Sequence, residues 1–127
     1  MSERILIVED NQQVLSQLQL ALSQEGYQVT TAVNGLDGYN KAQQQMFDLC
    51  VVDHLMPLMA GPQLLKNLSA LGSNRPSCII FLSTQELKSV QQLSEISYAD
   101  KILSKPLDID VFIQSVKELL EYEDAVA

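Results

Sequence analysis

Short apolar stretches recur along the chain and predict buried strands. The run at 49–52 has no polar residue alternating within it and ends abruptly at Asp53. An uninterrupted run of this kind is typical of a strand that is covered on both faces in a parallel sheet. Other apolar or alternating runs predict four more strands, at 4–8, 27–32, 77–82 and 99–103.

Between these strands, apolar residues recur three or four positions apart, as they do on one face of a helix. This spacing predicts helices over 11–25, 36–46, 61–71 and 85–96, and a last helix that begins after a cap at Asp108. Five strands alternating with five helices favour an α/β domain with parallel strands and right-handed crossovers. The pattern itself leaves the order of the strands in the sheet open.

Two of the predicted helices have weaker apolar faces than the others. In the helix at 36–46 the predicted buried stripe consists of Leu36, Tyr39, Ala42 and Met46. The helix at 85–96 has apolar residues three apart and is polar elsewhere. We therefore expect the helix at 85–96 to be the least firmly packed.

Composition narrows the class of protein. A chain of 127 residues with 46% hydrophobic and 19% charged residues is expected to form one globular domain over 1–127, with no output domain. The net charge of −8 opposes binding to nucleic acid. No apolar run approaches the ~18 residues that span a membrane, and the first strand begins too early for a secretory signal. We expect a cytoplasmic protein whose two cysteines, Cys50 and Cys78, lie in the core.

Polar residues follow four of the five predicted strands. Because the carboxyl ends of parallel strands meet at one edge of the sheet, where ligands bind in such folds, these side chains should converge. The residues are Glu9 and Asp10, Asp53, Ser83 and Thr84, and Ser104 and Lys105.

Three carboxylates at one edge repel one another. Two unit charges ~4 Å apart cost about 4 kcal/mol at an effective dielectric constant near 20. A divalent cation together with Lys105 would balance the charge, and oxygen ligands favour Mg²⁺, Mn²⁺ or Ca²⁺ over zinc. Such a site suits phosphoryl transfer to a carboxylate. Taken singly, Asp10 or Asp53 could instead cap a helix.

Four segments in order, 8–11, 53–61, 82–84 and 104–106, give the chain a specific resemblance. Over essentially its whole length it resembles a receiver domain of two-component response regulators, of the single-domain chemotaxis type. The resemblance implies a flavodoxin-like (βα)5 fold with five parallel strands in the order 2-1-3-4-5. It also implies a signalling phosphoacceptor that assists its own phosphorylation and dephosphorylation rather than an enzyme.

The resemblance further implies roles for individual residues. Asp53 is the expected phosphoacceptor, and Mg²⁺ is expected to be held by Glu9, Asp10, Asp53 and the backbone carbonyl of Leu55. Ser83 is the expected switch hydroxyl. Lys105 is expected to pair with the phosphoryl group and to precede a cis proline bond.

The expected partners also follow from the resemblance. The phosphoryl donor is expected to be a phosphohistidine on a histidine kinase or a histidine phosphotransfer protein. A downstream protein target is expected to bind through residues 85–122. Neither direct nucleic-acid binding nor membrane binding is expected.

Some positions depart from the family pattern. Ile102 stands where the family usually has an aromatic switch residue, and Tyr98 is a candidate to replace that ring in space. We interpret His54 as a variable loop residue that points away from Asp53.

Three other functions can be weighed against the prediction that the chain is a phosphoacceptor. Ile102 favours a protein-interaction module that works without phosphorylation, although a module of that kind would not need the full set of acids, hydroxyl and lysine. A phosphatase-like enzyme would want a general acid at position 55, which is Leu55. A flavin-binding relative would need a phosphate-cradling loop where the acidic Glu9 and Asp10 stand.

Overall fold

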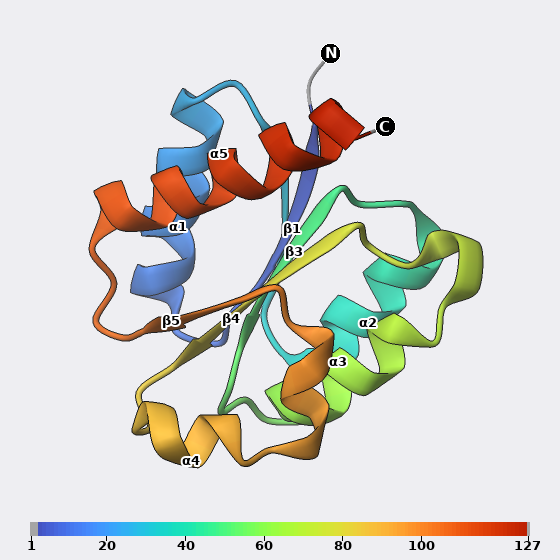
Figure 1. Cartoon of the computed structure of the whole chain (residues 1–127), viewed down its shortest axis with the longest axis vertical. Helices are drawn as coiled ribbons and strands as arrows, with labels where there is room; N and C mark the ends of the chain where they lie inside the picture. Colours follow the sequence, from blue (N-terminus) through green and yellow to red (C-terminus); the bar gives the residue numbers. More distant parts are fainter. Residues whose placement is uncertain (1–2, 127) are drawn as a thin grey trace.

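The structure is a computed structural model that describes the backbone of residues 3–126 and the side chains of residues 3–121. Five parallel strands form one sheet in the order β2-β1-β3-β4-β5, as Figure 1 shows. This order confirms the α/β fold expected from the sequence. The strands are β1 (Arg4–Val8), β2 (Gln28–Ala32), β3 (Leu49–Asp53), β4 (Cys78–Ser83) and β5 (Lys101–Ser104).

Helices cover both faces of the sheet. Helices α1 and α5 pack on one face, and α2 and α3 pack on the other (Figure 1). The α-helices are α1 (Gln12–Gln24), α2 (Gly35–Gln44), α3 (Gly61–Ser69), α4 (Leu87–Gln91) and α5 (Ile109–Val126), and two short 3-10 helices are η1 (Gly72–Asn74) and η2 (Ser94–Tyr98).

The central strands β3 and β4 are buried along their whole length. Their side chains alternate between two apolar clusters, as the pleat of a strand requires. Leu49 and Val51 belong to the cluster under α1 and α5, whereas Cys50 and Val52 belong to the cluster under α2 and α3. The apolar run that predicted β3 therefore lies in the middle of the molecule.

Individual residues in the sequence explain where several of the helices begin or end. The Asn11 side chain accepts a hydrogen bond from the Val14 N–H and caps α1. Gly26 and Gly72 have φ values of +94° and +63°, which let the chain leave α1 and α3 in a left-handed conformation. The Asp108 carboxylate accepts hydrogen bonds from two N–H groups at the start of α5.

Two of the predicted helices differ in the structure. The helix expected over 85–96 is a five-residue helix, α4, followed by the 3-10 helix η2. Residues 84–89 are all exposed, and α4 buries Val90, so this segment has little apolar surface with which to hold a longer helix. In α2 the predicted stripe is partly wrong, because Leu36 and Met46 are exposed and Gly35, Gly38 and Ala42 form the buried face.

The two cysteines lie in the core, as expected. Cys50 and Cys78 are both buried, and burial raises the pKa of the Cys50 thiol. No helix in the part of the chain that the structure describes is long and apolar enough to cross a membrane.

Candidate functional site

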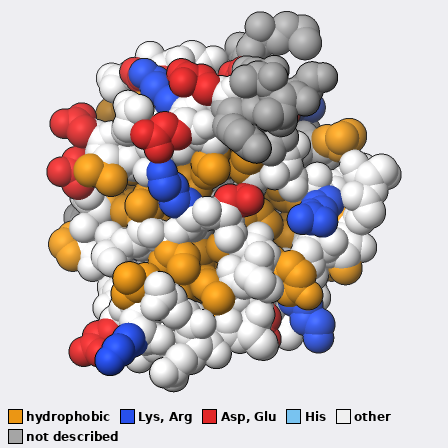
Figure 2. All heavy atoms as spheres, viewed as in Figure 1, with side chains coloured by type: hydrophobic (Ala, Val, Ile, Leu, Met, Phe, Trp, Pro, Cys, Tyr) orange, Lys and Arg blue, Asp and Glu red, His pale blue; other side chains and the backbone are white. Residues whose placement is uncertain are grey.

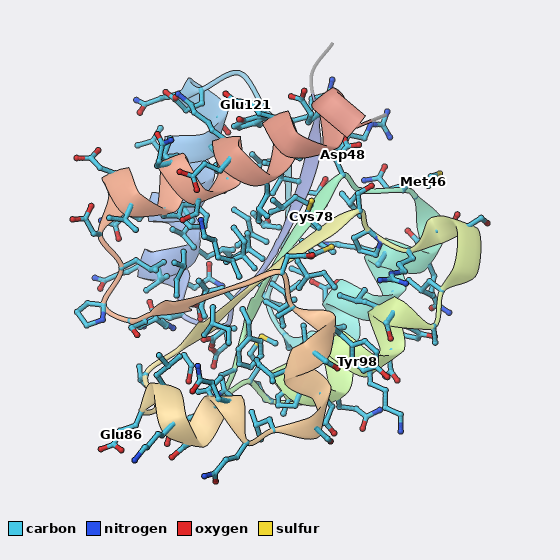
Figure 3. The ribbon with its side chains drawn as sticks, viewed as in Figure 1. Met46, Asp48, Cys78, Glu86, Tyr98 and Glu121 are labelled. Carbon is cyan, nitrogen blue, oxygen red and sulfur yellow. The ribbon has the colours of Figure 1, made fainter. Side chains whose placement is uncertain are left out.

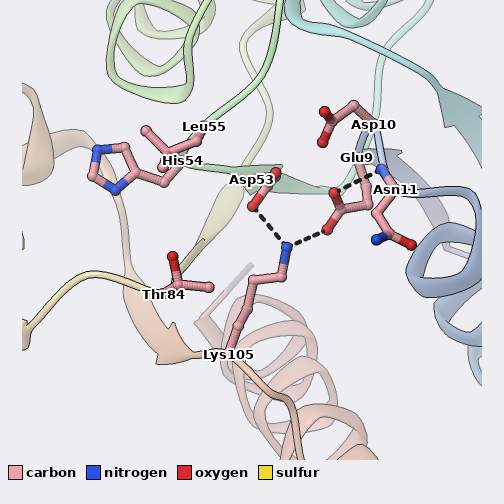
Figure 4. Close-up of a pocket in the computed structure, with 8 residues that line it drawn as sticks. All are labelled: Glu9, Asp10, Asn11, Asp53, His54, Leu55, Thr84 and Lys105. Atoms are coloured by element: carbon pink, nitrogen blue, oxygen red, sulfur yellow. Dashed lines mark hydrogen bonds and ion pairs between the residues drawn. The ribbon is translucent and has the colours of Figure 1, made fainter.

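The carboxyl ends of β1 and β3 bring three acids together. Carboxylate oxygens of Glu9, Asp10 and Asp53 lie within 4.8 Å of one another. Glu9 and Asp53 are buried, whereas Asp10 is exposed at the rim. Figure 4 shows the three side chains around one cleft of about 430 Å³. The convergence predicted from the strand ends is therefore present.

Lys105 reaches this cluster from the end of β5. Its Nζ lies 2.8 Å from Glu9 Oε1 and 3.1 Å from Asp53 Oδ1, so it joins the two buried acids (Figure 4). The second oxygen of Glu9 accepts a hydrogen bond from the Asn11 N–H at 3.1 Å. The Lys105–Pro106 bond is cis, as expected. One ammonium thus faces three carboxylates.

The electrostatics of the cluster follow from burial and charge. Burial raises the pKa of Glu9 to about 7, although the hydrogen bonds from Lys105 and the Asn11 N–H oppose this change. Burial alone would lower the pKa of Lys105, but hydrogen bonds to Glu9 and Asp53 and their charges outweigh it and raise the pKa. The lysine is therefore held as a cation between Glu9 and Asp53.

The remaining walls of the cleft come from two loops. Leu55 lies on the loop after β3, and Thr84 lies on the loop after β4. Within the first loop, Leu58 has a φ of +65°, a left-handed conformation that is unfavourable for a residue with a branched side chain. This turn directs the chain from Asp53 back to α3.

Ser83 lies beside the cleft but is not among the described residues that line it. Its side chain is buried, and its Oγ is 2.7 Å from Nδ1 of His54 and accepts a hydrogen bond from the Gln85 N–H at 3.0 Å. His54 points away from Asp53, as expected (Figure 4). Its contact with Ser83 was not predicted from the sequence, but the register of β3 against β4 accounts for it. Asp53 of β3 pairs with Leu82 of β4, so the residues that follow them, His54 and Ser83, are neighbours.

The aromatic ring expected near the switch hydroxyl does not come from β5 or η2. Ile102 is half-buried and packs with the apolar cluster under α2 and α3. Tyr98 lines a shallow hollow with Lys66 of α3 (Figure 3). The ring that contacts Ser83 is that of His54, and burial lowers the pKa of His54 below its ordinary value.

The fold and the site together define an α/β domain with an acidic cleft at the carboxyl edge of its parallel sheet, and comparison with known proteins identifies the family. The model of the response regulator receiver domain matches residues 5–117. The chain is 34% identical over 119 residues to the transcriptional regulatory protein PcoR of Escherichia coli, covering 93% of this chain and 51% of the relative. It is 30% identical over 118 residues to the response regulator ArlR of Staphylococcus aureus, covering 92% and 52%.

Solved structures agree with this assignment. A CheY-like receiver domain protein from Methanospirillum hungatei superimposes with a TM-score of 0.89 and 26% identity over the full length of both chains. The receiver domain of a sensor histidine kinase from Pseudomonas aeruginosa, solved with a magnesium ion coordinated in its active site cleft, gives a TM-score of 0.86 at 22% identity, covering 95% of this chain and 99% of that one.

The chain belongs to the response regulator receiver domain family. Proteins of this family are signalling phosphoacceptors of two-component systems, which receive a phosphoryl group from histidine kinases. The chain spans about half the length of the curated relatives it matches.

Proposed function

We propose that this chain works as a phosphorylation-driven switch in which Asp53 accepts a phosphoryl group. The observation that carries the proposal is the cluster itself. Three carboxylates lie within 4.8 Å of one another, and Lys105 Nζ bonds both Asp53 and Glu9. A domain that served only as a binding scaffold would gain nothing from burying two acids beside a part-buried lysine, because ionised groups are costly to remove from water.

The donor set fits a hard divalent cation. All the clustered side-chain ligands are carboxylate oxygens, which Mg²⁺ prefers, and the exposed rim at Asp10 leaves room for water or phosphate oxygens. The proposed ligands are Glu9, Asp10, Asp53 and the backbone carbonyl of Leu55. When bound, Mg²⁺ would supply positive charge against the phosphoryl oxygens.

In the proposed reaction the main task of the protein is to position the reacting groups and to balance their charge. Lys105 binds Asp53 Oδ1 and leaves the second oxygen of that carboxylate to attack the phosphorus of a phosphohistidine. The new O–P bond forms as the N–P bond breaks, and the electron pair returns to the imidazole of the donor. The donor is a histidine kinase or a histidine phosphotransfer protein. Lys105 then faces the added negative charge.

The proposed output is a changed protein-interaction surface. Phosphorylation adds charge and acceptor oxygens at Asp53, and the hydroxyl of Ser83, at the end of β4, is the group that we propose responds. The segment after Ser83 is exposed, and hydrophobic side chains gather over the face that carries β5 and α5 (Figure 2). We place the binding of a downstream protein on residues 85–122.

One specific observation favours a second candidate, an interaction module that is independent of phosphorylation. Ile102 packs into the apolar cluster as a half-buried aliphatic residue, so β5 lacks a ring that could swing between buried and exposed states. This candidate predicts constitutive partners and no response to a phosphoryl mimic.

Titration with beryllofluoride, a phosphoryl mimic, tests both candidates. Amide NMR spectra are recorded for the wild type and for Asp53→Asn, each with and without Mg²⁺. The switch predicts saturable shifts near residues 53, 83 and 105 that require Mg²⁺ and vanish in the variant. If the wild type shows no binding at millimolar Mg²⁺, the switch is wrong and the module is the better description.

A further inference from the structure

The side chain of His54 is held firmly against Ser83. The His54 N–H donates to the Leu82 carbonyl at 2.9 Å, and its carbonyl accepts from the Gly61 N–H at 2.8 Å. The backbone at this position is therefore tied to β4 on one side and to the start of α3 on the other. The imidazole rests against Phe81, with ring centroids 5.1 Å apart. The ring stays where its Nδ1 meets the Ser83 hydroxyl.

The hydroxyl of Ser83 has two hydrogen-bond partners in this arrangement. A serine hydroxyl has one proton and two lone pairs. Ser83 Oγ bonds His54 Nδ1 at 2.7 Å and accepts from the Gln85 N–H at 3.0 Å. With 2% of its surface exposed, Ser83 has little access to water as a substitute partner.

The two bonds hold Ser83 on the side of the sheet opposite to the Asp53 carboxylate. Ser83 lies two residues after Phe81 and therefore shares its face of the sheet, which packs under α2 and α3. Asp53 lies two residues after Val51 and therefore shares the other face, under α1 and α5. A hydroxyl that turns toward a group on Asp53 must therefore leave His54. In the tautomer that carries the ring proton on Nε2, the Ser83 O–H donates to His54 Nδ1, so His54 and the phosphoryl group compete for the same donor.

We infer that His54 is a positioning residue that holds the Ser83 hydroxyl in the resting orientation and sets how readily it turns to the phosphoryl group. This inference rests on the proposed function of Asp53. Breaking the bond also releases the His54 ring, which is half-exposed and lies at the mouth of the cleft. The response of Ser83 is thus passed to the loop after β3, in a chain whose β5 carries Ile102 in place of a ring.

Two substitutions separate the hydrogen bond from the packing of the ring. His54→Phe keeps a ring against Phe81 and removes the nitrogen that bonds Ser83. His54→Asn removes the ring and keeps a polar atom near the position of Nδ1, so it is the variant expected to restore the bond. Each is combined with Ser83→Ala, which removes the hydroxyl, to complete a double-mutant cycle.

The measurement is the dissociation constant of beryllofluoride at saturating Mg²⁺, followed by amide NMR. We expect His54→Phe to bind about two- to tenfold more tightly than the wild type, which corresponds to the net free energy of one hydrogen bond. His54→Asn should bind like the wild type. In the Ser83→Ala background, His54→Phe should change nothing, because the competing hydroxyl is gone.

A second readout follows the ring directly. The ¹⁵N resonance of His54 Nδ1 should move on saturation of the wild type and should not move on saturation of Ser83→Ala. Equal effects of His54→Phe with and without Ser83 would show that the ring only packs, and would overturn the inference while leaving the function of Asp53 intact. If the wild type itself binds no beryllofluoride, the proposed function and this inference fall together.

Discussion

Glu9 and Asp10 are adjacent in the sequence but have different environments. Glu9 is fully buried, and both of its oxygens are bonded, one to Lys105 and one to the Asn11 N–H. Its replacement would leave the part-buried ammonium of Lys105 with one partner fewer. Asp10 is exposed at the rim of the same cluster. Asp10 can therefore be changed to test cation binding with little risk to the fold.

Asp10→Asn should weaken Mg²⁺ binding by about tenfold or more, because it removes one of three charges that act on the cation at close range. The free energy of unfolding without metal should stay the same or rise slightly, since one repulsive carboxylate is gone. Both quantities can be measured by NMR titration and by urea unfolding.

Glu86→Gln is the matched control for this substitution. Glu86 is an exposed acid outside the cleft, its side chain makes no capping hydrogen bond, and the change removes the same unit of charge (Figure 3). If Glu86→Gln weakens Mg²⁺ binding as much as Asp10→Asn does, the cation responds to the net charge of the protein and not to the cluster.

At the scale of elements, the contact between α2 and β1 depends on Gly38. A Cβ added at this position would lie 2.6 Å from Val8 Cγ2 and 2.9 Å from Val8 Cγ1. Val8 is fully buried and immediately precedes Glu9, so it cannot move without disturbing the end of β1. The glycine thus sets how closely α2 covers the strand that leads into the site.

Gly38→Ala should destabilise the protein by about 1–3 kcal/mol because of overpacking. Helix propensity alone predicts the opposite sign, a gain of about 1 kcal/mol. Asn40→Ala, at an exposed position of α2, is the control and should show a small gain. Urea unfolding decides the sign, and a stabilised Gly38→Ala would mean that α2 can shift freely on the sheet.

The strands and the acidic cluster could be predicted from the sequence because each depends on a local pattern. The apolar run of β3 ends at Asp53 in the structure as it does in the sequence. Parallel strands bring their carboxyl ends to one edge, so Glu9, Asp53 and Lys105 had to converge once the strands were correct. The order of the strands came from the resemblance and is confirmed by the structure.

What the sequence did not reveal depends on packing between elements. Periodicity could not show that α2 turns Gly35 and Gly38 inward and leaves Leu36 exposed, because a glycine carries no apolar side chain to mark its face. The short length of α4 could not be predicted for a similar reason. The spacing of apolar residues does not show whether another element of the fold is present to cover them. The bond between His54 and Ser83 required the register of β3 against β4.

At the scale of the whole molecule, charge is unevenly placed. The chain carries 16 acidic residues against eight lysines and arginines, and three of the acids share one edge of the sheet with Lys105. Asp53 is distant from Glu9 and Asp10 in an unfolded chain, so the complete cation site exists only after folding. A cation that binds there must stabilise the folded state.

Mg²⁺ should therefore raise the unfolding temperature of the wild type by several degrees. At a concentration one hundred times the dissociation constant, one site that exists only in the folded state contributes about 2.7 kcal/mol. A sodium salt at equal ionic strength measures the general screening of the net charge of −8, which both ions provide. The difference between the two salts, followed by circular dichroism, should shrink strongly in Asp10→Asn. An equal rise in both salts would show that Mg²⁺ acts by screening, and the cluster of Glu9, Asp10 and Asp53 would then be no cation site.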